Sequence, residues 1–314
     1  MRVNSTERGP MGRKALLRVM VVVATVGSAV TLTAGPANAA TGVFLSGSNV
    51  IVNAGAGVAN NITINVSGNS IIIQDTRAVL TAGTGCALQT NGSVACGISP
   101  NDATVVVNAG DLGDTITKIG NVRGDLRGQT GNDTINGGPS PGSNILNGGA
   151  DRDTLNGGPT FDLLIGGAGP DRLSGGGGTN DIASYFESGA GVVVDIDNTA
   201  DDGIGGEGDD VRTDVEIVYG SEFNDTITGS ASNDSMLGFG GSDRLVGGAG
   251  NDNLTGDLVP SNSGLVGSDT LIGGPGNDTL NGVDNIRGND SLDGGDQTDT
   301  CTADTSDTKR FCEA

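Results

Sequence analysis

The sequence predicts an all-β protein: a parallel β-roll solenoid of nine-residue repeats with a small N-terminal β domain. Glycine reaches 57 of 314 residues without a strict three-residue period, which excludes a collagen helix. Only 3% of the residues are aromatic and tryptophan is absent, so an ordinary globular core is not expected. From Gly128 onward one nine-residue pattern returns in register, which is typical of a repeat architecture.

Residues 1–39 have the order of a secretory signal peptide. Five basic side chains and one acid lie within the first 18 residues, an apolar run extends from Val19 to Leu32, and Ala37 and Ala39 form an A-x-A site. We expect cleavage after Ala39 and a secreted, extracellular protein, with either Met1 or Met11 as the true start. Polar and small residues break the apolar run, so no membrane span is expected in the mature chain.

Net charge is −22 and becomes more negative when the basic signal peptide is removed. Such a chain repels nucleic acid, so no nucleic-acid partner is expected, and it attracts cations.

Residues 40–108 are predicted to form the small β domain, because short apolar runs at 50–52, 62–66, 71–73 and 105–107 are separated by turn residues. It could be a ligand-binding module or an N-terminal cap for the roll. Its hairpin GCALQTNGSVACG carries Cys86 and Cys96. Cys301 and Cys312 form a second short-range pair. Four cysteines allow three connectivities, and local pairing of each couple is the one that fits the layout of an exported chain.

The repeats occupy two blocks, residues 109–184 and residues 220–302. Units such as GGAGNDNLT (247–255) and GGPGNDTLN (273–281) place aspartate at position six and an aliphatic residue at position eight. Glycines permit a tight turn with positive φ, and the last three residues form a short strand that sends only position eight inward. Two repeats would make one coil.

Stacking the coils ~4.8 Å apart would bring the position-six aspartates into columns. At ~5 Å, two carboxylates repel by ~0.8 kcal/mol in water and about fourfold more at the effective dielectric of a protein surface. A hard divalent cation between successive turns removes this repulsion. Calcium accepts six to eight oxygens in flexible geometry, which carboxylates and backbone carbonyls can supply together, so several Ca²⁺ ions are the expected cofactor.

These units resemble the GGxGxDxUx nonapeptide of the haemolysin-type, or RTX, calcium-binding repeat. The resemblance extends over about residues 109–302 and implies a parallel β-roll with calcium between neighbouring turns on each side. Carried over by position, it implies the following metal ligands: Asp133, Asp153, Asp162, Asp171, Asp181, Asp225, Asp234, Asp243, Asp252, Asp269, Asp278, Asp290, Asp299 and, from the imperfect unit 109–117, Asp114. Asn144 replaces the aspartate in one unit, and residues 256–263 and 282–284 interrupt the register, so weaker calcium binding is expected there.

The remaining segments are a spacer and a tail. Residues 185–219 are interpreted as an acidic β spacer, with a strand at 192–197. Residues 303–314 are predicted to fold back over the open end of the solenoid as a C-terminal cap, with the Cys301 sulfur inside, Cys312 bonded to it and Phe311 as an apolar lid.

An enzyme is not expected, because the chain has no histidine for a zinc site, a serine triad or a histidine base. A carboxylate-based glycoside-acting enzyme needs no histidine, but the aspartates are engaged by the repeats and a narrow roll offers no pocket. The predicted function is therefore an extracellular calcium-binding structural or matrix protein that folds on binding calcium. The alternative is a calcium-dependent adhesin for cell-surface or extracellular polysaccharide.

Overall fold

The computed structural model describes residues 40–139, 142–257, 267–284 and 289–313. These residues belong to one compact unit that begins at Asn38, and they form strands and turns with no helix. Accordingly, the described part of the chain offers no helix long and apolar enough to cross a membrane. The expected signal peptide lies outside the described residues.

The described strands form three sheets. In spatial order, sheet A contains β28 (Thr300–Ala303), β26 (Thr279–Gly282), β24 (Asn253–Asp257), β22 (Ser235–Phe239), β20 (Ile217–Tyr219), β16 (Ile182–Ser184), β14 (Asp162–Ala168), β12 (Asn144–Ala150), β10 (Arg123–Thr130), β8 (Thr104–Gly110), β2 (Asn49–Asn53), β1 (Ala40–Ser46) and β5 (Val79–Ala82). Sheet B contains β19 (Asp210–Val211), β15 (Arg172–Gly176), β13 (Thr154–Gly158), β11 (Thr134–Asn136), β9 (Thr115–Lys118), β3 (Asn61–Ser67), β4 (Ser70–Asp75), β7 (Val94–Cys96) and β6 (Cys86–Leu88). Sheet C contains β18 (Gly203–Ile204), β17 (Val192–Asp195), β21 (Thr226–Thr228), β23 (Arg244–Val246), β25 (Thr270–Pro275), β27 (Ser291–Asp296) and β29 (Thr308–Arg310).

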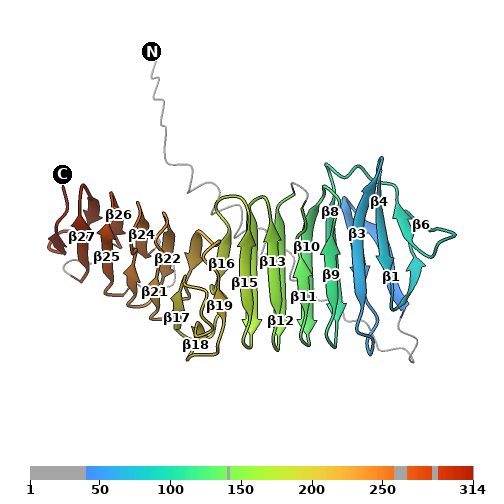
Figure 1. Ribbon diagram of the computed structural model, residues 1–314, viewed down its shortest axis with the longest axis horizontal. Helices are drawn as coiled ribbons and strands as arrows, with labels where there is room; N and C mark the ends of the chain where they lie inside the picture. Colours follow the sequence, from blue (N-terminus) through green and yellow to red (C-terminus); the bar gives the residue numbers. More distant parts are fainter. Residues whose placement is uncertain (1–39, 140–141, 258–266, 285–288, 314) are drawn as a thin grey trace, which may run out of the picture. The chain divides into compact units, whose positions relative to one another are not determined.

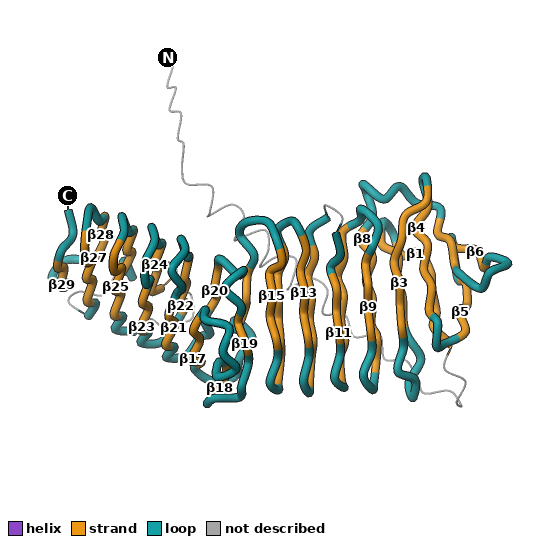
Figure 2. Tube along the Cα trace, viewed as in Figure 1, coloured by secondary structure: helices purple, strands orange, loops and turns teal. Residues whose placement is uncertain are grey.

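The chain forms coils of two strands each. From β8 to β16, successive strands alternate between sheets A and B, and from β20 to β29 they alternate between sheets A and C (Figure 1). Every pairing between neighbouring coils in these two stretches is parallel, as in the pairs β10–β12 and β22–β24. Turns connect the strands at both ends of each coil (Figure 2). This arrangement confirms the predicted parallel β-roll.

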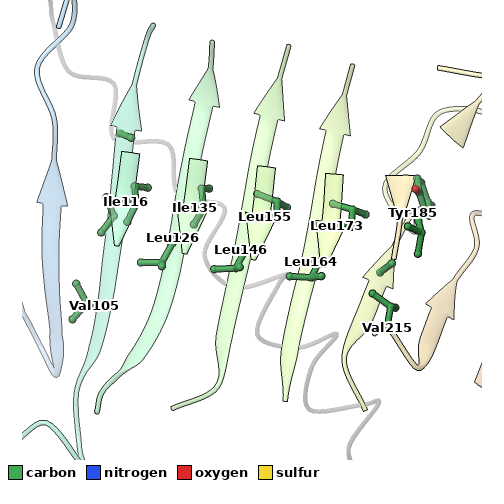
Figure 3. Close-up of a cluster of buried hydrophobic side chains, with 14 of the residues drawn as sticks. Val105, Ile116, Leu126, Ile135, Leu146, Leu155, Leu164, Leu173, Tyr185 and Val215 are labelled. Carbon is green, nitrogen blue, oxygen red and sulfur yellow. The ribbon is translucent and has the colours of Figure 1, made fainter. Parts of the chain in front are cut away.

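The core consists of aliphatic side chains stacked in rows, one from each strand. Strand pairing aligns Leu126 with Leu146 and Leu146 with Leu164 in sheet A. In sheet B, the same row is formed by Ile116, Ile135, Leu155 and Leu173 (Figure 3). All of these side chains have no exposed surface. Position eight of the repeat therefore faces the interior, as its period-two alternation predicts.

The N-terminal strands extend the same sheets. β2 and β3 pair in parallel with β8 and β9, whereas β1 pairs with β2, and β4 with β3, in antiparallel fashion. β6 and β7 form a hairpin in which Cys86 lies opposite Cys96, and the two cysteines are disulfide-bonded. Sheet A ends with β5, which pairs in parallel with β1, and sheet B ends with the β6–β7 hairpin, in which β7 pairs with β4.

The spacer contributes strands to all three sheets. Sheet A runs through it, because β16 pairs with β20 in the register Ile182 to Ile217. β19 is the last strand of sheet B, and β17 pairs with β21 near the beginning of sheet C. The spacer is therefore where the second layer of the roll changes from sheet B to sheet C.

The C-terminal tail returns to the roll through β29, which pairs with β27. Cys301 packs against the core and is disulfide-bonded to Cys312, with 5.7 Å between their Cα atoms. The expectation that Phe311 covers the last coil is wrong, because its side chain is 61% exposed and stacks near the Arg310 guanidinium. The backbone of the tail, held by β29 and the disulfide, lies along the last coils instead.

Candidate cation sites

The predicted ligands share one environment: every position-six aspartate is buried, with at most 3% of its surface exposed. Each lies just before, or at the first residue of, a strand of the roll, where the glycine-rich turn ends. Parallel pairing without change of register then places aspartates of successive coils side by side. They form three columns, which we name after the sheet that each one borders.

Column B borders sheet B and consists of Asn60, Asp114, Asp133, Asp153, Asp171 and Asp209. In each step the backbone N–H of one member donates to Oδ1 of the next, at 2.5–2.8 Å. Every aspartate thus receives a hydrogen bond from the coil before it. The last member, Asp209, belongs to the acidic spacer.

Column A borders sheet A and consists of Asn144, Asp162, Asp181, Glu216, Asp234, Asp252, Asp278, Asp299 and Glu313. The same N–H-to-carboxylate bonds, at 2.6–3.0 Å, connect its members except between Glu216 and Asp234. Strand pairing makes those two neighbours as well, since Ile217 lies opposite Ser235. The interruption at 256–263 does not break the column, because Asp252 donates to Asp278 across 26 residues of sequence.

Column C borders sheet C and consists of Asp225, Asp243, Asp269, Asp290 and Asp307. Three N–H-to-carboxylate hydrogen bonds of 2.8–2.9 Å connect its first four members, and the fourth bond, from the Asp290 N–H to Asp307, is 3.4 Å long. The insertion at 282–284 therefore leaves Asp290 in place beside Asp269. Column C thus continues past both interruptions, because Asp243 donates to Asp269 and Asp269 donates to Asp290.

One oxygen of almost every aspartate has no protein partner. Oδ1 or Oδ2 is buried without a hydrogen bond in all of the predicted ligands except Asp225. A buried carboxylate oxygen without a partner costs free energy, since water no longer solvates it. These oxygens are therefore positioned to bind something other than the protein.

In typical repeats the unpartnered oxygen faces the first glycine of the same repeat. A Cβ atom at Gly157 would lie 2.7 Å from Asp162 Oδ2, and one at Gly166 would lie 2.5 Å from Asp171 Oδ2. The space beside Gly157 is also bordered by the carbonyl oxygen of Gly175, which belongs to the next coil. Glycine at position one keeps this space free, and a carboxylate and a carbonyl oxygen border it.

Burial perturbs the titration of the columns. It raises the pKa of Asp133 and Asp153 to about 7, that of Asp171 to about 8 and that of Asp243 to about 9, with a smaller contribution from neighbouring carboxylates. The hydrogen bonds from the preceding coil lower these pKa values only in part. With these pKa values and no cation, the four aspartates bind protons near neutral pH.

The oxygen set fits calcium better than a transition metal. Within the described residues, histidine, cysteine, aspartate and glutamate form no group of three or more side chains close enough to hold a metal ion. A site here must combine one or two carboxylates with backbone carbonyls, and calcium accepts such hard oxygen ligands in irregular geometry. The unpartnered oxygens and the open glycine spaces meet that requirement.

Sequence reasoning missed the acids that extend the columns outside the repeats: Asp209, Glu216, Asp307 and Glu313. Two of them carry a readable signal, an acid followed two residues later by an interior aliphatic. Val211 follows Asp209 and Val218 follows Glu216, and both valines are fully buried. Asp307 lacks this signal, because Lys309 occupies the aliphatic position opposite Leu292.

Position five of the repeat was also missed as a structural position. The side-chain oxygen of Asn233 accepts the N–H of Asn251 at 2.7 Å, and Asn251 accepts the N–H of Asn277 at 2.8 Å. These bonds run from the later coil to the earlier one, opposite to those of the aspartates. Position five therefore adds a second, more exposed set of bonds between coils.

Asp225 and Asp234 differ from the other column members because serine follows the first glycine in their repeats. Ser221 donates its backbone N–H and its hydroxyl to Asp225, so both oxygens of this carboxylate have partners. Ser230 donates in the same way to Oδ2 of Asp234, whose Oδ1 stays unpartnered. The second block thus begins with two carboxylates that accept hydrogen bonds from serines of their own repeats.

Stacked two-strand coils, one interior aliphatic per strand and buried acid columns define a solenoid of cation-binding repeats. A family model described as the RTX calcium-binding nonapeptide repeat, in four copies, matches residues 125–155, 156–184, 219–254, 263–283 and 287–307. Residues 125–307 therefore contain RTX calcium-binding nonapeptide repeats, which confirms the resemblance seen in the sequence. No curated protein matches it.

Proposed function

We propose that this chain is an extracellular structural protein whose β-roll is completed by calcium bound along columns A, B and C. Calcium binding as such follows from the repeat family. The assignment of individual ligands is our proposal: in each coil, the unpartnered oxygen of the position-six aspartate and a carbonyl of the first-glycine turns bind the ion.

The single observation that carries the proposal is the burial of these carboxylates without partners for one oxygen each. A fold that buries so many acids in contact with one another opposes its own formation unless a cation or a proton neutralises them. Calcium supplies that neutralisation at neutral pH, and the binding free energy then becomes folding free energy. The same aspartates also connect neighbouring coils, because the N–H of one donates to Oδ1 of the next. This agrees with a structural role.

An extracellular location is supported by the signal-like residues 1–39 and by the two disulfides, since disulfides persist in oxidising compartments. Calcium outside cells reaches the roughly 10⁻⁴ to 10⁻³ M at which extracellular modules bind it. The order of events would be export of an unfolded chain, then folding on contact with external calcium. Mass spectrometry of the secreted protein checks the export step, because cleavage after Ala39 leaves Ala40 as the first residue.

The test is a calcium titration of the mature chain, residues 40–314, followed by circular dichroism. In excess chelator at pH 8 we expect little β signal, and a cooperative gain of β structure as calcium is added. Magnesium at the same concentration is the matched control, because its stricter octahedral geometry fits the irregular oxygen set less well. A full β spectrum in chelator, or an equal response to magnesium, would refute the proposal.

A further inference from the structure

Lys118 is the largest side chain among the described residues that is completely buried. It is the last residue of β9 and follows the interior residue Ile116 by two positions, so it points to the same side. Its ammonium donates to the carbonyl oxygen of Gly142 at 3.3 Å. A buried lysine is costly without compensation, so its position needs a physical reason.

The register of sheet B shows which position of the repeat Lys118 occupies. Thr117 lies opposite Asn136, and Asn136 lies opposite Asn156, so the next residues in the three coils, Lys118, Gly137 and Gly157, are equivalent. In other coils this is the first-glycine position, whose missing side chain leaves the space beside the column A carboxylate open. In this coil the space is available to the lysine side chain.

The column A residues of the same coils change with it. Gly124 lies opposite Asn144, and Asn144 lies opposite Asp162, so the coil that carries Lys118 has glycine in place of the aspartate and the next coil has an uncharged amide. Asp162 is the first carboxylate of column A. The coil that carries the positive charge of Lys118, and the coil after it, therefore lack the column A aspartate that would bind calcium.

The electrostatics of the neighbouring carboxylate agree with this placement. Burial lowers the pKa of Lys118, and the nearby Asp162 opposes that effect. Burial raises the pKa of Asp162 to about 6, and Lys118 is the smallest of the influences that oppose this rise, after the two hydrogen bonds from Asn144. Each group thus favours the charged form of the other.

We propose that the Lys118 ammonium occupies the first cation position of column A, so that the chain itself takes the place of a calcium ion there. The inference rests on the proposed function, since it needs calcium in the coils that follow. Column A would then begin with a tethered cation that no chelator removes, and calcium binding in this column would start at Asp162.

Two variants and a control test the proposal in the mature chain. Lys118→Met keeps the length of the side chain and removes its charge. The double variant Lys118→Gly with Asn144→Asp restores the repeat pattern at this coil. Lys309→Met makes the same substitution at an exposed lysine of β29. Circular dichroism in saturating calcium first shows that each variant has folded.

Hydrogen exchange in saturating calcium is the first measurement. For Lys118→Met we expect amides of β9, β10 and β12 to exchange about tenfold faster than in the wild type, because opening these coils no longer breaks the bond from the ammonium to Gly142. Exchange in β22, β24 and β26 stays unchanged, and Lys309→Met behaves as the wild type. Wild-type exchange in β9, β10 and β12 of Lys118→Met overturns the proposal.

Counting bound calcium by native mass spectrometry is the second measurement. The double variant should bind an additional calcium ion and keep wild-type protection in β9–β12 only while calcium is present. The same calcium count as the wild type overturns the inference even if the variant folds. A wild type that binds no calcium would instead refute the proposed function, so the two failures are distinguishable.

Discussion

Replacing Asp252 by asparagine should have opposite effects on the protein with and without calcium. Asp252 lies inside column A, where its Oδ1 accepts the N–H of Asp234 and its own N–H donates to Asp278, both at 2.8 Å. Asparagine keeps an oxygen that can accept the first bond and leaves the second intact. The substitution therefore removes one negative charge and little else.

The size of the effect follows from the spacing of the coils. Neighbouring strands lie ~4.8 Å apart, so Asp252 repels each of its two neighbours by ~0.8 kcal/mol in water and by about 3 kcal/mol at an effective dielectric of 20. Removing its charge should stabilise the metal-free roll by about 2 kcal/mol, the lower end of this range, because the neighbours relax and bind protons. With calcium, the lost ligand should raise the calcium midpoint about tenfold, or about 1.4 kcal/mol.

Acid provides the assay for the metal-free state. Burial raises the folded-state pKa of Asp252 to about 6 and that of Asp243 to about 9, above the ordinary value of 3.8. Groups of this kind stabilise the fold fully below their unfolded pKa, and that stabilisation is lost as pH rises through the folded values. In chelator the wild type should therefore gain β structure at acid pH and lose it between about pH 6 and 9.

Asp252→Asn should shift that loss to higher pH in chelator, and should raise the calcium midpoint at pH 7.5. Asp102→Asn, at an exposed aspartate outside the columns, is the matched control and should change neither value. Circular dichroism measures both transitions. A variant that is destabilised in chelator as well as in calcium would refute the reasoning, because it would show that Asp252 acts by packing and not by charge.

Three further predictions concern the glycine space, the column ends and the tail. Gly166→Ala should raise the calcium midpoint about tenfold without removing a carboxylate, because its Cβ would lie 2.5 Å from Asp171 Oδ2. Gly189→Ala, where a Cβ meets open space, is the control and should have no effect. Equal effects of the two substitutions would contradict a calcium site beside Gly166. Asp290→Asn should shift the midpoint less than Asp252→Asn, because Asp290 is next to last in its column, and equal shifts measured by circular dichroism argue against cooperative stacking. Cys312→Ser should speed hydrogen exchange in β27–β29 before any other coil, and unchanged exchange there would exclude a stabilising role for the disulfide.

The repeating part of the fold could be predicted from the sequence because one short pattern specifies it many times. Position eight supplies the core, as Leu155 and Leu254 show, and position six supplies the columns. Both positions depend on local rules: the alternation of a strand and the turn chemistry of glycine. The same rules apply in every coil, so errors in single units do not change the fold.

Other features depend on contacts that sequence spacing does not encode. Asp209 follows Asp171 by 38 residues and Glu216 follows Asp181 by 35, so the acids that continue columns B and A through the spacer are out of step with the repeat. Their place is set by the pairing of β19 and β20 with strands of the preceding block. The exposure of Phe311 likewise depends on how β29 pairs, which the composition of the tail does not reveal.

The direction of the aspartate hydrogen bonds has a consequence for the growing chain. Apart from Asp234, each aspartate of a column accepts a hydrogen bond from the coil before it, and its own N–H donates to the acid of the coil that follows. A chain made or exported from its N-terminus therefore always ends in a coil whose donor has no acceptor. Acids outside the repeats end all three series: Asp209 accepts the N–H of Asp171, Glu313 that of Asp299 and Asp307 that of Asp290. Removing Glu313 or Asp307 would therefore take this acceptor away from the last coil of the column, and the loss would reach the coil before it through the same series of bonds.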